Sequence, residues 1–267
     1  MPTSAASYLK LVSRKTSNHK CVSRIVWGGS GHDTIYGGSG HDSLWGGTGD
    51  DRLEAGSGND TVRGDHGNDV IKGQDGADRL YGNSGHDNVG GNSGDDVIYG
   101  GYGHDKIYGG LGNDALRGNA GNDIMYGGSH NDSLFGSEGN DKLYGGTGAD
   151  VLVGSSGDDT LNGGGGNDKL YFGQDAHSRG GTGIDIAYGG DGADQFIFGG
   201  TSGWTQIADF EDGVDKIVFS DSDINSMSDL SINRDANNDK VVIDYGDGII
   251  RIETNDVSSV GADDFIF

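Results

Sequence analysis

The sequence has little of what usually stabilises or targets a chain of this size. Its 267 residues include one proline and one cysteine, Cys21, and only 32% are hydrophobic. A single cysteine excludes an internal disulfide framework. No apolar run approaches the roughly 20 residues that cross a bilayer, so we expect no membrane span. Residues 1–27 also lack the apolar segment of a cleavable signal peptide.

Basic residues are scarce too. The chain has 42 acidic and 18 basic side chains, which gives a formal net charge of -24. Such a surface repels phosphate backbones and anionic lipid, so we expect no nucleic-acid partner and no membrane-surface partner. A compact state with this charge also repels itself unless cations bind. The composition therefore predicts cation binding.

Glycine is abundant instead, and it recurs in a nine-residue repeat. The 55 glycines lie mostly in sixteen consecutive units that run from Gly28 to residue 171. Position one is Gly except at Ala55, position four is Gly except at His130, and position eight is always aliphatic or Met. A fixed period of this kind predicts a solenoid, in which each unit buries its apolar residue only against its neighbours.

Position six is aspartate in every unit. After an irregular segment of eight residues, 172–179, two further units at 180–188 and 189–197 resume the pattern, and we expect this slip to produce a kink or a bulge. The candidate metal ligands are Asp33, Asp42, Asp51, Asp60, Asp69, Asp78, Asp87, Asp96, Asp105, Asp114, Asp123, Asp132, Asp141, Asp150, Asp159, Asp168, Asp185 and Asp194.

The unit has the chemistry of a hard-cation site. Glycine at positions one, two and four allows positive φ, which turns carbonyl oxygens inward. One carboxylate per unit completes an all-oxygen shell, and such a shell favours Ca²⁺ over Mg²⁺, which demands a tighter octahedron. The three residues after the turn, such as Thr34, Ile35 and Tyr36, are predicted to form a short strand with the central side chain inward.

The repeat GGxGxDxUx, where U is apolar, resembles the glycine-rich nonapeptide of the repeats-in-toxin (RTX) calcium-binding family. The resemblance implies an all-β fold, a right-handed parallel β-roll over residues 28–197 with two nonapeptides per turn. It also implies that Ca²⁺ lies between units n and n+2. Asp33 would then share an ion with Asp51, and Asp168 with Asp185, for about 15 ions in all. Asp194 would have no evident partner.

The C-terminal part looks different. QIADF, KIVFS, KVVIDY and GIIRIE are predicted to be short strands. The segments GADQFIFGG, IADFEDGVDKIVFS and GADDFIF resemble the ends of RTX exoproteins such as serralysin-type proteases and RTX lipases. For residues 198–267 this resemblance implies a β-rich cap with a signal for a type I ATP-binding-cassette secretion machine. Residues 1–27 are basic and contain no acid, and we interpret them as a disordered leader.

Two side-chain patterns raise the question of further binding sites. Position nine is often aromatic, as at Tyr81 and Tyr99, which suits either glycan stacking or cross-strand packing, and we favour packing. His32, His41, His86 and His104 occupy position five, where we favour solvent-facing loop residues over a transition-metal site.

No catalytic signature is present, because HExxH and GxSxG are both absent. The sequence therefore predicts a secreted, extracellular, monomeric and non-catalytic calcium-binding protein that folds on binding Ca²⁺, with a structural, adhesive or secretion-assisting role. The first alternative is the carrier part of an RTX enzyme or toxin, and the second is a glycan-binding module.

Overall fold

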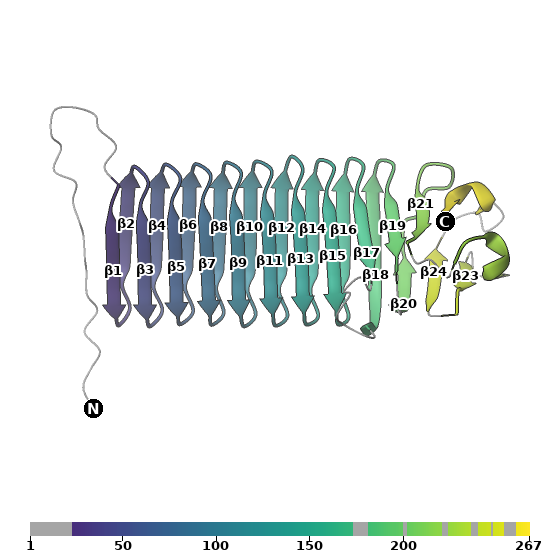
Figure 1. Ribbon diagram of the computed structural model, residues 1–267, viewed down its shortest axis with the longest axis horizontal. Helices are drawn as coiled ribbons and strands as arrows, with labels where there is room; N and C mark the ends of the chain where they lie inside the picture. The colour runs from purple at the N-terminus through teal and green to yellow at the C-terminus, as the bar shows by residue number, and fades with distance from the viewer. Residues whose placement is uncertain are drawn as a thin grey trace. The chain divides into compact units, whose positions relative to one another are not determined.

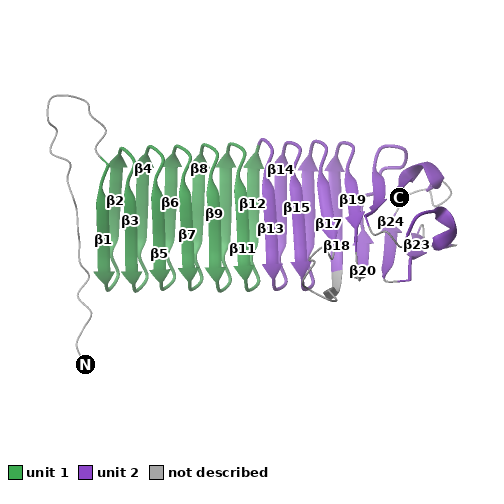
Figure 2. Ribbon diagram, viewed as in Figure 1, with its two compact units in different colours: residues 1–129 green, residues 130–267 purple. Residues whose placement is uncertain are grey.

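The structure is a computed structural model that describes residues 23–172, 181–199, 202–220, 224–235, 240–246, 248–253 and 260–267. The chain divides into two compact units, Met1–Ser129 and His130–Phe267 (Figure 2). The strands of the first unit are β1 (Ile25–Ser30), β2 (Thr34–Ser39), β3 (Ser43–Thr48), β4 (Arg52–Ser57), β5 (Thr61–His66), β6 (Val70–Asp75), β7 (Arg79–Ser84), β8 (Asn88–Ser93), β9 (Val97–Tyr102), β10 (Lys106–Leu111), β11 (Ala115–Ala120) and β12 (Ile124–Ser129).

The second unit contains further strands and two 3₁₀ helices. Its described elements are β13 (Ser133–Glu138), β14 (Lys142–Thr147), β15 (Val151–Ser156), β16 (Thr160–Gly165), β17 (Lys169–Phe172), β18 (Gly181–Asp191), β19 (Gln195–Phe198), β20 (Ser202–Ile207), β21 (Lys216–Phe219), η1 (Met227–Asp229), β22 (Ser231–Asp235), β23 (Lys240–Asp244), β24 (Ile249–Glu253), η2 (Ala262–Asp264) and β25 (Phe265–Ile266).

In the first unit, strands that are two apart in the sequence are neighbours in a sheet. One parallel sheet has the order β1-β3-β5-β7-β9-β11 and the other has β2-β4-β6-β8-β10-β12 (Figure 1). The register advances by 18 residues, so that Val26 pairs with Leu44 and Leu44 with Val62. One turn therefore holds two nonapeptides. The predicted all-β fold, a parallel β-roll, is confirmed.

The core is a stack of single apolar side chains. Position eight faces inward in every described strand of the repeat, and residues such as Ile35, Leu44 and Leu80 are fully buried. Burial of such a side chain is worth about 1.5–3 kcal/mol. With one large apolar residue per nine, this core is thin, and hydrogen bonds between turns supply much of the remaining order.

The strands are longer than the sequence predicts. Each regular strand has six residues, as in β2, whereas only the three around the apolar residue were expected. The ladder continues through the glycines, because Gly38 pairs with Gly56 and Ser39 with Ser57. Only positions four to six form the turn between strands.

The irregular segment changes the register in the second unit. Between β16 and β18 the offset rises to 26 residues, as in Leu161 pairing with Ala187, and β18 and β20 show a register shift between Gly181 and Ile184. The shift fits the expected bulge. The offset therefore exceeds the regular one by eight residues, and most of the predicted slip, 173–179, lies outside the described residues.

The described part of the C-terminal segment 198–267 is β-rich, as predicted. β21 pairs with β25 in parallel at the end of one sheet, whereas β22, β23 and β24 are antiparallel at the end of the other. At the other end of the chain, β1 starts at Ile25. The first strand therefore includes the last three residues of the segment that was interpreted as a leader.

Outward aromatic side chains stack on one another. The ring centroids of Tyr81 and Tyr99 are 5.2 Å apart and their planes differ by 2°, and Tyr108 and Tyr126 are related in the same way, with planes 6° apart. Arg63 lies over the Tyr81 ring, 4.4 Å from its centroid. The preferred interpretation, cross-strand packing, is confirmed for these pairs.

Replacing Ile98 with Ala tests the role of the apolar stack. Ile98 is fully buried in β9, so the free energy of unfolding should fall by about 2–5 kcal/mol. Urea unfolding followed by circular dichroism measures it. Val97→Ala, at the adjacent half-buried outward position, should change stability by less than about 1 kcal/mol and serves as the control. Equal losses from both variants would contradict the assigned facing.

Candidate metal centre

The aspartates at position six face inward because of the alternation of an extended chain. Positions six and eight are two residues apart, so they point to the same side, and so does position one of the next unit. The regular aspartates from Asp33 to Asp168 are 1–3% exposed. The structure thus places each of them inside a turn, where an unpaired carboxylate is expensive.

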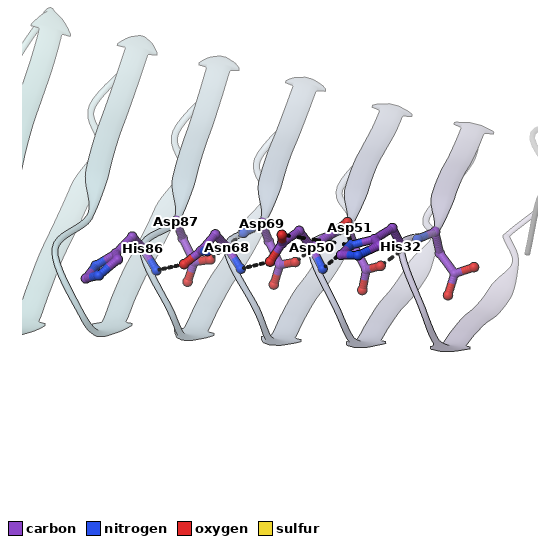
Figure 3. A network of polar contacts seen from close by, with 8 residues as sticks. His32, Asp50, Asp51, Asn68, Asp69, His86 and Asp87 are labelled. Atoms are coloured by element: carbon purple, nitrogen blue, oxygen red, sulfur yellow. Dashed lines mark hydrogen bonds and ion pairs between the residues drawn. The ribbon is translucent and has the colours of Figure 1, made fainter. Parts of the chain in front are cut away.

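The carboxylates form a hydrogen-bonded ladder from turn to turn. The backbone N–H of Asp69 donates to Asp87 Oδ1 at 2.7 Å, 18 residues further along (Figure 3). Within the first unit the pairs joined in this way are 33/51, 42/60, 51/69, 60/78, 69/87, 78/96, 87/105, 96/114 and 105/123. Within the second they are 132/150, 141/159, 150/168, 159/185 and 168/194.

The second carboxylate oxygen has no donor in most turns. In the first unit, Oδ2 is buried without a hydrogen bond in Asp42, Asp51, Asp60, Asp69, Asp78, Asp87, Asp96 and Asp105; in the second unit it is so in Asp150, Asp168 and Asp194. Native proteins rarely leave buried carboxylate oxygens unsatisfied. A row of such oxygens fits a bound cation, which would take the place of a donor.

Backbone carbonyl oxygens approach the same space. A Cβ built on Gly28 would be 2.5 Å from the carbonyl oxygen of Gly46 and 2.6 Å from Asp33 Oδ2. Glycine at position one therefore leaves room where carboxylate and carbonyl oxygens converge. Among the described residues no three His, Cys, Asp or Glu side chains gather, so a shell here needs these carbonyls. This donor set fits Ca²⁺.

The role of glycine differs between its three positions, which corrects one prediction. Positions two and four have positive φ, as at Gly29 (105°) and Gly31 (114°), but position one does not. Position one requires glycine for space rather than for its φ angle. At position two some turns use other residues at positive φ, among them Asp65 at 74°.

Burial raises the pKa values of several aspartates in the ladder. Removal of the carboxyl from water raises the pKa of Asp69 to about 7, although the hydrogen bond from the Asp51 backbone N–H acts in the opposite direction. For Asp87 and Asp96 the pKa is also about 7, again mainly through burial and then through neighbouring aspartates. A protein that keeps these groups ionised at neutral pH needs a positive charge beside them.

At the irregular segment the hydrogen-bond ladder does not follow the one pairing expected there, Asp168 with Asp185. Asp185 accepts a hydrogen bond from the N–H of Asp159, not from Asp168, and Asp194 accepts one from Asp168. Asp194, for which no partner was expected, thus has one. Both hydrogen bonds span 26 residues, so the ladder resumes at the next complete unit.

The ladder extends beyond the residues that were predicted. Asp215 is buried and its Oδ1 accepts the N–H of Asp194 at 3.0 Å. The sequence GVDKI carries the signal, since it keeps the glycine, aspartate and apolar spacing of the repeat. Its Oδ2 accepts the N–H of Glu211, so Asp215 ends the row with both oxygens satisfied.

In the first unit, one row of aspartates begins at an arginine. The N–H of Arg24 donates to Asp42 Oδ1 at 2.7 Å, so Arg24 stands where a preceding aspartate would be. Its guanidinium lies over Gly38. Asp209 has a similar capping role in the second unit, where its oxygens accept the N–H groups of Gly189 and Gly190. No repeat signal marks Asp209.

The histidines at position five are more than solvent-facing loop residues. They are exposed, as predicted, but His86 Nδ1 accepts the N–H of His104 at 2.7 Å and His32 Nδ1 accepts that of Asp50 at 2.8 Å. Accepting at Nδ1 assigns the ring proton to Nε2. The rings of His86 and His104 stack with centroids 5.1 Å apart. The geometry does not gather them around one transition metal.

His130 departs from the repeat and shows the strain that glycine avoids. Its φ is 81°, in the left-handed region that side chains with Cβ rarely adopt. Just before it, the Gly112 N–H to Ser129 carbonyl distance is 3.3 Å, whereas Gly94 to Leu111 is 2.7 Å and Gly103 to Ala120 is 2.8 Å. The cross-turn ladder is stretched at this point.

The comparisons agree with this geometry. The chain matches the family described as RTX calcium-binding nonapeptide repeat (4 copies) at residues 27–62, 54–89, 82–116, 90–125, 111–143, 144–176 and 177–202. The chain therefore belongs to the RTX calcium-binding nonapeptide repeat proteins, whose repeats bind calcium and whose members are typically secreted.

Among the solved structures 34 chains match, and the curated proteins gave no match. The extracellular lipase LipA from Serratia marcescens shares 18% identity, and the alignment covers 86% of this chain with a TM-score of 0.31. This chain spans 40% of the length of that lipase. Among the described residues no helix is long and apolar enough to cross a membrane.

His130→Gly should stabilise the roll. Relief of one non-glycine residue at positive φ is worth about 1 kcal/mol, so the urea midpoint at a fixed Ca²⁺ concentration should rise. Gly94→His is the matched opposite, because a Cβ there would collide with the carbonyl oxygen of Gly76, and it should lower the midpoint. An unchanged midpoint for His130→Gly would show that position four tolerates a side chain.

Without metal, protonation of the buried aspartates at low pH should stabilise part of the fold. The raised pKa values mean that the folded, metal-free roll binds more protons than the unfolded chain, whose aspartates titrate near about 3.9. This contribution is complete below about pH 4 and is lost as the pH rises through about 7. Circular dichroism in a chelator should therefore show more strand at pH 5 than at pH 8. Identical spectra at both pH values would contradict the burial of protonatable aspartates.

Proposed function

We propose that this protein is a secreted, non-catalytic β-roll that folds outside the cell when it binds Ca²⁺, with one ion for each pair of aspartates along the ladder. The observation that carries the proposal is the row of buried Oδ2 atoms without donors. Without metal, carboxylates such as Asp69 and Asp87 face each other from successive turns and repel. Binding energy then becomes folding energy.

The net charge makes this coupling a switch. At low cytosolic Ca²⁺ a chain with a charge of -24 stays unfolded, which suits export through a narrow channel. Extracellular calcium modules bind at about 10⁻⁴ to 10⁻³ M, so ions outside the cell suffice for folding. The number expected is about 15, as the count of aspartate pairs suggests. The folded roll is proposed to act as a monomeric structural or adhesive element.

A titration with Ca²⁺ tests the proposal. In excess EGTA at pH 8 the far-ultraviolet circular dichroism should show little strand, and addition of Ca²⁺ should restore it cooperatively. Mg²⁺ at the same concentrations is the control and should restore little, because it dehydrates reluctantly and demands octahedral geometry. A strand-rich spectrum that persists in EGTA would sink the proposal of metal-coupled folding.

Export is proposed to depend on the terminal residues. Asp264 is buried and pairs with Lys216 at 3.6 Å, and Phe265 pairs with Ile217, so this segment belongs to the end of the fold. The adjoining Ile266 and Phe267 are exposed. A type I ATP-binding-cassette exporter would read the segment before folding, when all of it is accessible.

Deletion of residues 263–267 should trap the protein inside a host that carries a matching type I exporter, as measured by secreted against cell-associated protein. Lys216→Met is the control, because it removes the ion pair with Asp264 but leaves the terminal sequence unchanged, and it should be exported normally. Undiminished export of the truncated form would place the signal elsewhere.

A specific feature favours a second function, that of the calcium-binding part of a larger enzyme or toxin. Ile25 and Trp27 on β1 are 73% and 66% exposed, and both oxygens of Asp33 are buried without donors. A further folded segment packed on β1 would cover the two apolar side chains and would supply hydrogen-bond donors to the Asp33 oxygens. An in-frame protease, lipase or pore-forming region encoded with this chain would support this second function over the stand-alone roll.

A further inference from the structure

Position five carries a second ladder on the outside of the turns. The side chain of Asn68 accepts the backbone N–H of His86 at 2.7 Å, and Asn68 in turn donates its own N–H to Asp50 Oδ1 at 2.8 Å (Figure 3). The other position-five pairs within the two units, acceptor first, are 32/50, 41/59, 59/77, 86/104, 95/113, 104/122, 131/149, 140/158 and 167/193.

The residue types at this position share one property. Asn and Asp accept through Oδ1 and His accepts through Nδ1, and each of these atoms is bonded to Cγ. The acceptor therefore stands at the same distance from the backbone in all three. Position five holds only these residues in the regular units, apart from Ala77 and Ala149. The residues at this position therefore share the length of the side chain and the place of its acceptor atom, but not its charge.

The outer ladder and the aspartate ladder join the same two turns in opposite directions. Asn68 accepts from the N–H of His86, one residue before Asp87, while Asp87 accepts from the N–H of Asp69, one residue after Asn68. The two bonds fix both the backbone and the carboxyl of the later turn. With Oδ1 of Asp87 engaged, Oδ2 is held toward the inner space that Gly82 leaves open.

We propose that the side chain at position five is a positioning residue for the calcium site of its edge: it holds the turn 18 residues ahead so that the aspartate of that turn presents Oδ2 to the ion. This inference rests on the proposed calcium function. Besides its metal ligands, each site then requires a side chain with a hydrogen-bond acceptor bonded to Cγ, at the position just before each coordinating aspartate in the sequence.

The two edges of the first unit differ in this respect. On the edge that carries His32, Asp50, Asn68, His86 and His104, the acceptors form an unbroken run. On the edge that carries His41 and Asn59, Ala77 supplies no acceptor, so the turn of Asp95 is not held in this way. The ion shared by Asp78 and Asp96 should accordingly be released sooner than the ion shared by Asp69 and Asp87.

Two substitutions in neighbouring units test this. Asn68→Ala opens a gap on the unbroken edge, and Ala77→Asn fills the gap on the other. In the Ca²⁺-loaded protein, Asn68→Ala should speed amide hydrogen exchange at His86 by about tenfold or more, because that N–H loses its acceptor. In stopped-flow mixing with a chelator, a small part of the bound Ca²⁺ should leave about two- to tenfold faster.

Rescue separates positioning from general stability. Asn68→His supplies Nδ1 at the same place and should restore both readouts, whereas Asn68→Leu, which has similar bulk and no acceptor, should not. Ala77→Asn should slow Ca²⁺ release from one part of the array and protect the amide of Asp95. Ca²⁺ release in Asn68→Ala at the rate of the natural protein, or equal behaviour of the His and Leu variants, would overturn the inference.

The outcomes also separate the inference from the proposed function. If the natural protein folds on Ca²⁺ and Asn68→Ala releases its ions normally, only the positioning role is wrong. If the natural protein keeps its strands in EGTA, both are wrong, whatever the amide of His86 shows. A uniform acceleration of all Ca²⁺ release in Asn68→Ala would mark position five as a general contributor to stability and would also overturn the positioning role.

Discussion

The structure depends on one constraint, the placement of an acidic side chain inside every turn. A carboxyl such as that of Asp87 has one oxygen bonded to a backbone N–H and the other buried without a donor. Leaving such a group ionised and unpaired costs several kcal/mol, which the thin apolar stack cannot offset turn after turn. The folded state therefore requires protons or cations at these positions. The proposed coupling of folding to Ca²⁺ binding follows from this geometry.

The distribution of the other residues follows from the same constraint. Glycine at position one leaves the space in which the oxygens converge, and the residues at positions two and four turn the chain around it. The acids gather at the turns, whereas basic and aromatic side chains such as Arg63, Tyr81 and Tyr99 stand on the outer face of the strands. Attraction between these layers is weak at the surface, so it does not replace the cation.

The periodicity made much of the fold predictable. A nine-residue repeat with an apolar eighth position fixes which side chains face inward, and the sixth position then faces inward as well. The pairing at the irregular segment was not predictable by counting. The sequence of residues 172–179 fits either a distorted turn or an insertion, and only the hydrogen bonds from Asp159 to Asp185 and from Asp168 to Asp194 show where the pairing resumes. Strand length was also underestimated, because pairing of glycines depends on the neighbouring turn.

The candidate metal ligands could be predicted from the sequence, but the residues at position five that hold the turns could not. Position six is invariant, so the aspartates were evident, yet position five varies among Asn, Asp and His and therefore looked like loop sequence. What these residues share is the place of one acceptor atom, which matters only when the turn 18 residues ahead is beside it. A one-dimensional array couples each unit mainly to its neighbours, so such contacts decide how a loss at one turn spreads. The hydrogen bonds of the two ladders run in opposite directions between the same pair of turns, and they thereby join each turn to both the preceding and the following turn of its edge.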